Sequence, residues 1–162
     1  MPTEPPPYDL TLAREAFTNA AALHAEATRR GAGRLVPADL DRLRAADAAF
    51  CAAVAEGRVG DAIAADDAFH QVLLDAAGDP DLLVSNELLR PRLRRMDLWL
   101  FSRKTFAPGP SSHPEIIAAL EAGDAERAAV LVQRSFTEAG EALAAVLARR
   151  GTGGGGGNAG GR

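Results

Sequence analysis

The sequence predicts an all-α fold on three observations. Apolar residues recur at three- and four-residue spacing, which places them on one face of a helix. Alanine, leucine, arginine and glutamate, all strong helix formers, dominate the chain. No segment of useful length alternates apolar and polar residues as a half-buried strand would. With 162 residues, of which 47% are hydrophobic and 25% charged, the chain has the profile of one globular domain with a single core.

Breaker residues divide the chain into six predicted helices. Gly31, Gly57 and Gly78 follow the first three of them, and Pro37 fits the first turn of the second. Pro91 lies inside the fourth helix and should kink it, because proline removes one backbone hydrogen bond. The expected helices span about 9–30, 37–56, 59–77, 80–104, 112–122 and 124–150. Short connections between them favour an antiparallel bundle.

The two ends of the chain differ in composition from the rest. Residues 1–8 are rich in proline and residues 151–162 in glycine, so neither segment can bury enough apolar area to become ordered. We expect both ends to be disordered and the folded domain to span 9–150. The start of the chain lacks a signal-peptide pattern, and no apolar run is as long as a membrane helix. These features predict a cytoplasmic protein.

Charge and cysteine content exclude further classes of protein. A net charge of -4 argues against a nonspecific grip on nucleic acid or anionic lipid. The single cysteine, Cys51, excludes an internal disulfide and a cysteine-based zinc cluster, and we expect it in the core beside Phe50. Any metal in this chain should therefore be held by other residue types.

Five polar residues fall on helix faces that are otherwise apolar. Asp66 and His70 are one turn apart, so a carboxylate and an imidazole should face inward together. His113 precedes an apolar stripe in the fifth predicted helix, and Ser135 lies within one in the sixth. Arg14 is expected to share a face with apolar residues of the first helix. Burying such groups is costly unless they pair, bind a metal or line a wet cavity.

These residue types suit the binding of a metal and a small acid. One aspartate and two histidines can hold zinc or a similar divalent ion at about 2.0–2.2 Å. Arg14 could then receive the carboxylate of a ligand with two hydrogen bonds. The ordinary alternative is a surface Asp66–His70 pair, a partly exposed His113 and an arginine whose charge reaches the solvent. His24 lies off the expected Arg14 stripe and is predicted at the surface.

Two sequence segments resemble a known family. Residues 66–73, DDAFHQVL, followed by GDPDL at 78–82, resemble the D-x-x-F-H-x-x-L and G-N-P-x-L signature of the FCD domain. This domain is the C-terminal effector domain of FadR-type regulators in the GntR family. Residues 113–120, HPEIIAAL, with GD at 123–124, are similar to a second segment of that family. Arg14 falls where the first family helix carries an arginine, and the resemblance covers residues 9–149.

The resemblance implies an antiparallel bundle of six to seven helices that forms a homodimer. It also implies a divalent metal (Zn, Ni or Mn) held by one aspartate and three histidines, with a small carboxylate metabolite as ligand. Asp66, His70 and His113 match three of the metal ligands, and the fourth histidine falls on Ser135. A water could fill that corner, the metal could be held weakly, or the site could have lost its metal. Arg14 and Ser135 are the expected ligand-binding residues.

The sequence departs from the family pattern at three further places, and the first of them changes the expected function. FadR-type regulators read DNA through an N-terminal winged helix-turn-helix, but the first predicted helix here begins near residue 9. We therefore expect no direct DNA binding by this chain. Thr18 stands where the first family helix often carries glutamate, and Asp79 stands in place of asparagine, which should affect only a turn.

The sequence therefore predicts an effector-sensing and dimerisation domain rather than an enzyme or a membrane protein. One alternative is a protein-interaction module that pairs with full-length GntR-type regulators and draws them off DNA. A metal-dependent enzyme ranks below both readings, because there is no H-E-x-x-H arrangement and Asp67 points away from the face of Asp66. No general base is then evident beside the expected metal.

Overall fold

The fold is an all-α bundle. A computed structural model of the 162-residue chain describes residues 10–102 and 111–151, which hold six α-helices, one short 3₁₀-helix and no strand. The elements are α1 (Leu10–Gly31), η1 (Ala32–Arg34), α2 (Pro37–Ala55), α3 (Val59–Ala77), α4 (Pro80–Phe101), α5 (His113–Glu121) and α6 (Ala125–Gly151). The predicted disorder of residues 1–8 and 151–162 lies outside the described residues, except at Gly151, which is the last residue of α6 rather than part of a disordered tail. The predicted limits of the domain stay a prediction.

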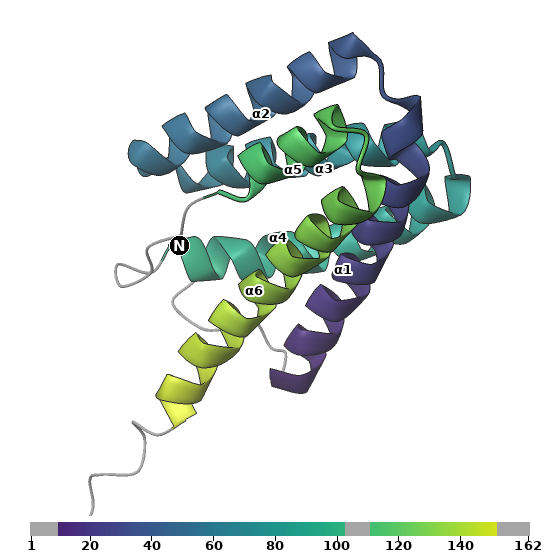
Figure 1. The fold of residues 1–162 in the computed structure, drawn as a ribbon. Coiled ribbons are helices and arrows are strands. Elements are labelled where there is room, and N and C mark those ends of the chain that lie inside the picture. Colours follow the sequence, from purple (N-terminus) through teal and green to yellow (C-terminus); the bar gives the residue numbers. More distant parts are fainter. Residues whose placement is uncertain (1–9, 103–110, 152–162) are drawn as a thin grey trace, which may run out of the picture.

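Helices α1 and α6 lie side by side and run in opposite directions (Figure 1). Their close approach depends on Gly140, where an added Cβ would lie 2.8 Å from the Cβ of Phe17. A side chain at this position would therefore push the two helices apart. Helices α2 and α3 also pack against each other, and Figure 1 shows them antiparallel. The antiparallel bundle expected from the sequence is confirmed.

The buried face of α1 is rotated by about one residue from the predicted face. It follows steps of four and three residues through five buried positions: Ala13, Phe17, Ala20, His24 and Ala27. The prediction that Arg14 shares this face is wrong, because its side chain lies beyond the edge of the stripe and is exposed. The prediction that His24 lies at the surface is wrong for the same reason, since His24 is near the middle of the stripe and 6% exposed. Because of this rotation, the polar residue that α1 places inside the bundle is His24, whereas Arg14 lies outside it.

The turn between α3 and α4 depends on two adjacent residues. Gly78 ends α3 with φ +63°, a left-handed conformation that glycine adopts without steric cost. Asp79 then caps α4 by accepting a hydrogen bond from the backbone N–H of Asp81 at 2.9 Å. Helix α4 continues as one element through Pro91 and ends at Phe101, earlier than predicted. The last predicted residues of that helix, 103–104, lie outside the described residues.

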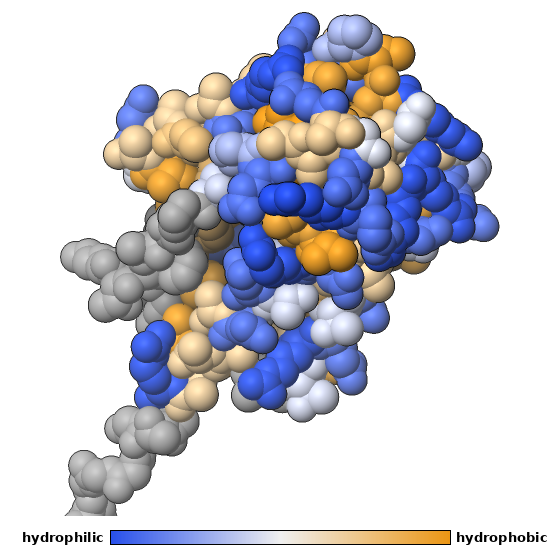
Figure 2. Space-filling model, in the orientation of Figure 1, coloured by the Kyte–Doolittle hydropathy of each residue, from blue (hydrophilic) through white to orange (hydrophobic). Residues whose placement is uncertain are grey.

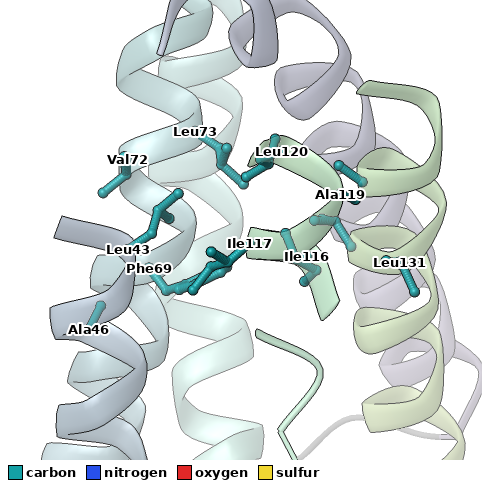
Figure 3. Close-up of a cluster of buried hydrophobic side chains, with 12 residues drawn as sticks. Leu43, Ala46, Phe69, Val72, Leu73, Ile116, Ile117, Ala119, Leu120 and Leu131 are labelled. Atoms are coloured by element: carbon teal, nitrogen blue, oxygen red, sulfur yellow. The ribbon is translucent and has the colours of Figure 1, made fainter. Parts of the chain in front are cut away.

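Two large apolar clusters and a small third one, made of Ala27, Leu74 and Ala77, form the core. Side chains of α2, α3, α5 and α6 point toward one another in the first cluster, as Figure 3 shows for Leu43, Phe69 and Ile117. Helices α1, α4 and α6 form the second, which contains Trp99. Phe136 packs against both large clusters, so the junction between them lies near this ring.

The face in Figure 2 is mostly hydrophilic, with hydrophobic areas that are small and separate. Cys51, expected in the core, is exposed instead. It lies on the outer side of α2, whereas Leu43 and Ala46 of the same helix are buried. Within the described ranges, none of the helices combines the length and the apolar character that crossing a membrane would require.

Candidate functional site

Asp66, His70 and His113 converge at the junction of the two large core clusters. Asp66 and His70 lie one turn apart on α3, and His113 is the first residue of α5. Oδ1 of Asp66 lies 3.0 Å from Nε2 of His113 and 3.8 Å from Nε2 of His70. Each residue offers one ligand atom, and these three atoms lie within 4.8 Å of one another. The three side chains that the sequence analysis grouped therefore lie close together, and their role as metal ligands stays a prediction.

The donor set fits a divalent metal. Tetrahedral zinc with bonds of about 2.0–2.2 Å separates its ligand atoms by about 3.4 Å, which lies between the two observed distances. Carboxylate and imidazole are both zinc ligands, and they also suit nickel and manganese. The His70 side chain is 6% exposed, and its Nδ1 has no hydrogen-bond partner within the described residues. A buried imidazole with unmet hydrogen bonding is costly in an empty pocket, so the cluster suits a bound group.

Asp47, on α2, fixes the orientation of His113. Its Oδ1 accepts a hydrogen bond from Nδ1 of His113 at 3.1 Å, and the Asp47 side chain is 19% exposed. The hydroxyl of Ser111 donates to the same Oδ1 at 3.2 Å and accepts from the backbone N–H of His113 at 3.1 Å. With Nδ1 engaged by Asp47, Nε2 of His113 is directed at Asp66. Carboxylates that hold a metal-binding histidine in this way raise its basicity and set its tautomer.

We expect Asp47→Asn to weaken zinc binding by about 10–100-fold, because an amide orients the imidazole poorly and does not raise its basicity. Zinc titration of chelator-treated protein by calorimetry measures the effect. The matched control is Asp41→Asn on the same helix, because Asp41 is 76% exposed and pairs only with Arg44. Equal zinc affinities of the Asp47 variant and the control would show that Asp47 does not support the site.

A cavity of about 120 Å³ is lined by two of the three ligand candidates, Asp66 and His70. Its described lining combines four phenylalanine rings with polar groups and small apolar side chains: Phe17, Phe50, Ile63, Asp66, His70, Asp97, Phe101, Ser135, Phe136 and Ala139. The Asp66 side chain is 39% exposed, so a ligand in the cavity can reach it. Ser135 is among the lining residues, as expected, but its hydroxyl donates to the carbonyl of Val132 at 2.7 Å. The cavity provides space for a small molecule beside the cluster.

Two carboxyl groups of the site respond differently to burial. Burial opposes ionisation of Asp66, but His70 and His113 outweigh it and hold the pKa of this carboxyl below its usual range. Burial raises the pKa of Asp97 well above its usual range, and the charges of Asp66 and Asp67 raise it further. The site therefore holds one carboxylate that imidazoles stabilise and one carboxyl group that no basic side chain of the described residues compensates.

His24, on α1, adds a third imidazole next to the cluster. Its ring stacks on Phe136 at 4.5 Å between centroids and lies 5.3 Å from the ring of His70. A side-chain hydrogen bond joins it to Asn86, which is buried on α4. Burial, with the nearby His70, lowers the pKa of His24 to about 3. His24 is therefore neutral in the folded protein at physiological pH.

This buried imidazole should make the protein sensitive to acid. The pKa of His24 is near 6.5 in the unfolded chain and about 3 in the folded protein. Between these values the unfolded chain binds a proton that the folded protein does not bind, so stability decreases as the pH falls below 6.5. Each pH unit costs about 1.4 kcal/mol, which amounts to about 3 kcal/mol at pH 4. Urea unfolding of chelator-treated protein between pH 7 and 4 measures the loss. We expect a shallower pH dependence for His24→Gln, whereas parallel curves would assign the acid sensitivity to other groups.

The structure brings together four of the five predicted site residues. Asp66, His70 and His113 form the cluster, and Ser135 lines its cavity. Arg14 is exposed and is not among the described residues that line the cavity, so its predicted contact with the ligand has no support in this geometry. Three further residues of the site were missed by the sequence analysis: Asp47, Asp97 and His24. Only His24 had a signal, the alternating four- and three-residue steps of the α1 stripe.

Comparison with known proteins agrees with this geometry. The family model of the FCD domain matches residues 15–138, which contain Asp66, His70 and His113. The chain belongs to the FCD domain family. No curated protein sequence matches the chain.

Membership of the FCD domain family indicates what the cavity can be used for. The FCD domain is the C-terminal effector-binding domain of GntR-family transcriptional regulators, and it is a regulatory domain. FCD domains bind small-molecule effectors. An internal cavity with polar groups on several helices fits such a ligand-sensing role.

Proposed function

We propose that this FCD domain senses a small organic acid inside the bundle and passes its occupancy to a GntR/FadR-type regulator. The observation that carries the proposal is the convergence of Asp66, His70 and His113 beside a cavity of about 120 Å³. These three residues would hold a divalent ion such as zinc, nickel or manganese. When bound, that ion would supply positive charge that attracts a carboxylate.

The neighbouring residues support this role in distinct ways. Asp47 holds His113, Phe69 stacks on its ring at 3.9 Å between centroids, and the phenylalanines of the cavity exclude water from the ligand. An ion pair or coordinate bond gains strength in such apolar surroundings. All six α-helices contribute a residue to the site or its support, so an occupied cavity would stiffen contacts across the bundle. We further propose that the domain works as a homodimer in the cytoplasm, as the family resemblance implies.

Metal and carboxylate titrations test the proposal. Chelator-treated protein is titrated with zinc, nickel and manganese, and the metal-loaded protein is then titrated with propionate, lactate and succinate. We expect about one ion per chain, and carboxylate binding that requires the ion. Asp66→Asn should lose both, whereas Asp75→Asn, an exposed change on the same helix, should retain both. Absence of metal and carboxylate binding in the unmodified protein would contradict the proposed function.

A further inference from the structure

Asp97, on α4, is an acidic residue that faces the interior and has no partner among the described residues. It lines the 120 Å³ cavity and also a smaller one of about 30 Å³, and both cavities are also lined by His70. Within residues 10–102 and 111–151, no hydrogen bond or ion pair reaches its carboxyl group. The ionisable groups that act on it are two further acids, Asp66 and Asp67. A carboxyl in this position is destabilising unless something in the cavity pairs with it.

The described lining of the larger cavity offers no such partner. It contains neither lysine nor arginine. Arg90 lines only the smaller cavity, where it pairs with Glu87 at 3.4 Å. The remaining polar residues in the described lining of the larger cavity are Asp66, His70 and Ser135. The Nδ1 atom of the buried His70 has no hydrogen-bond partner in the part of the chain that the structure describes. Two acids and an imidazole thus line a space whose other described walls are mostly phenylalanine rings, with Ile63, Ser135 and Ala139.

Aromatic rings suit the same kind of partner. Phe17, Phe50, Phe101 and Phe136 all line the cavity. The face of a phenylalanine ring attracts an ammonium group, and the attraction increases when water is excluded. An engineered cavity of about 150 Å³ holds benzene, so about 120 Å³ corresponds to a ligand of about six non-hydrogen atoms.

We propose that the ligand carries a protonated amine in addition to its carboxylate, and that Asp97 binds the amine. The ligand class is then a small amino acid, with its carboxylate at the Asp66–His70–His113 cluster and its ammonium group between Asp97 and the phenylalanine rings. This assignment rests on the proposed function for the carboxylate end alone. The amine end depends only on Asp97 and the aromatic walls, so it can be tested separately.

The test compares β-alanine with propionate, which differ by the amino group. Both are titrated by calorimetry into zinc-loaded protein, and propylammonium chloride is titrated into chelator-treated protein. We expect β-alanine to bind on the order of 30-fold more tightly than propionate, since a buried charge pair contributes this much or more. Asp97→Asn should remove this preference and also the binding of propylammonium. Asp75→Asn removes an exposed carboxylate of α3 and should preserve both.

The outcomes show separately whether the amine end and the carboxylate end of the ligand are bound as proposed. Equal affinities for β-alanine and propionate would overturn the inference and leave the proposed function in place. A preference that survives Asp97→Asn would also overturn it. If neither β-alanine nor propionate binds, the proposed function fails. The propylammonium titration then tests the amine site alone: binding that depends on Asp97 supports the inference, and absence of binding overturns it. If Asp97→Asn does not fold, the ratio of the two affinities in the unmodified protein decides alone.

Discussion

Replacing His70 with alanine is expected to lower the affinity for zinc by more than about 100-fold, because it leaves two protein ligands where at least three are needed. Of the two cluster residues on α3, His70 has the less exposed side chain, and its Nε2 lies 3.8 Å from Oδ1 of Asp66. Neither Gln71 nor Ser135 can replace an imidazole, since neutral oxygen donors bind zinc less well. Calorimetric titration with zinc, with dialysis and metal analysis as a second measurement, records the loss.

The fold of the His70 variant must be intact for this result to count. Burial holds the pKa of His70 at about 4, so the imidazole is neutral at pH 7 and its removal breaks no ion pair. We expect the helical circular dichroism spectrum to be unchanged. The complementary change, Ser135→His, adds an imidazole to the cavity wall beside His70 and should tighten zinc binding at least about tenfold, or about 1.4 kcal/mol. Equal zinc binding by His70→Ala and the unmodified chain would remove the metal from the proposed function.

Local periodicity explains why the fold and part of the site could be predicted from the sequence. A helix begins and ends where nearby residues require it, as Gly78 and Asp79 show between α3 and α4. Asp66 and His70 belong to one helix, so their spacing alone makes them neighbours. His113 lies on another helix, and it was grouped with them because it precedes an apolar stripe and because it matches the second family segment. The structure supplies the distances that the sequence could not.

The residues that were missed depend on how helices rotate and pack against one another. Asp47 is one of several acids on α2, and only the position of α5 brings it to Nδ1 of His113. Asp97 follows Arg94 and Arg95 in a charged segment of α4 and resembles a solvent-exposed residue until α3 and α6 are in place. The error at Arg14 has the same origin, because alanines on several sides of α1 leave the direction of its buried stripe poorly defined. The buried face of α1 is rotated by about one residue from the predicted face, so His24 is buried and Arg14 is exposed.

The Phe69 side chain links this site to the core. It is completely buried, belongs to the cluster drawn in Figure 3, and stacks on His113 with 13° between the ring planes. Removing the ring would therefore both leave a hole among Leu43, Val72 and Ile116 and free the imidazole on one face. The same substitution should thus affect stability directly and metal binding indirectly.

Phe69→Ala is expected to destabilise the metal-free protein by about 3–5 kcal/mol, the cost of removing a buried phenylalanine ring from a packed core. Urea unfolding in the presence of a chelator measures this loss. Leu88→Ala is the matched control, because Leu88 is 77% exposed and its truncation should change stability by less than about 0.5 kcal/mol. Phe69→Leu separates the two roles: it refills much of the hole, so most of the stability should return, but it cannot stack on His113, so zinc affinity should remain reduced. A Phe69→Leu protein with full zinc affinity would show that Asp47 alone suffices to hold His113.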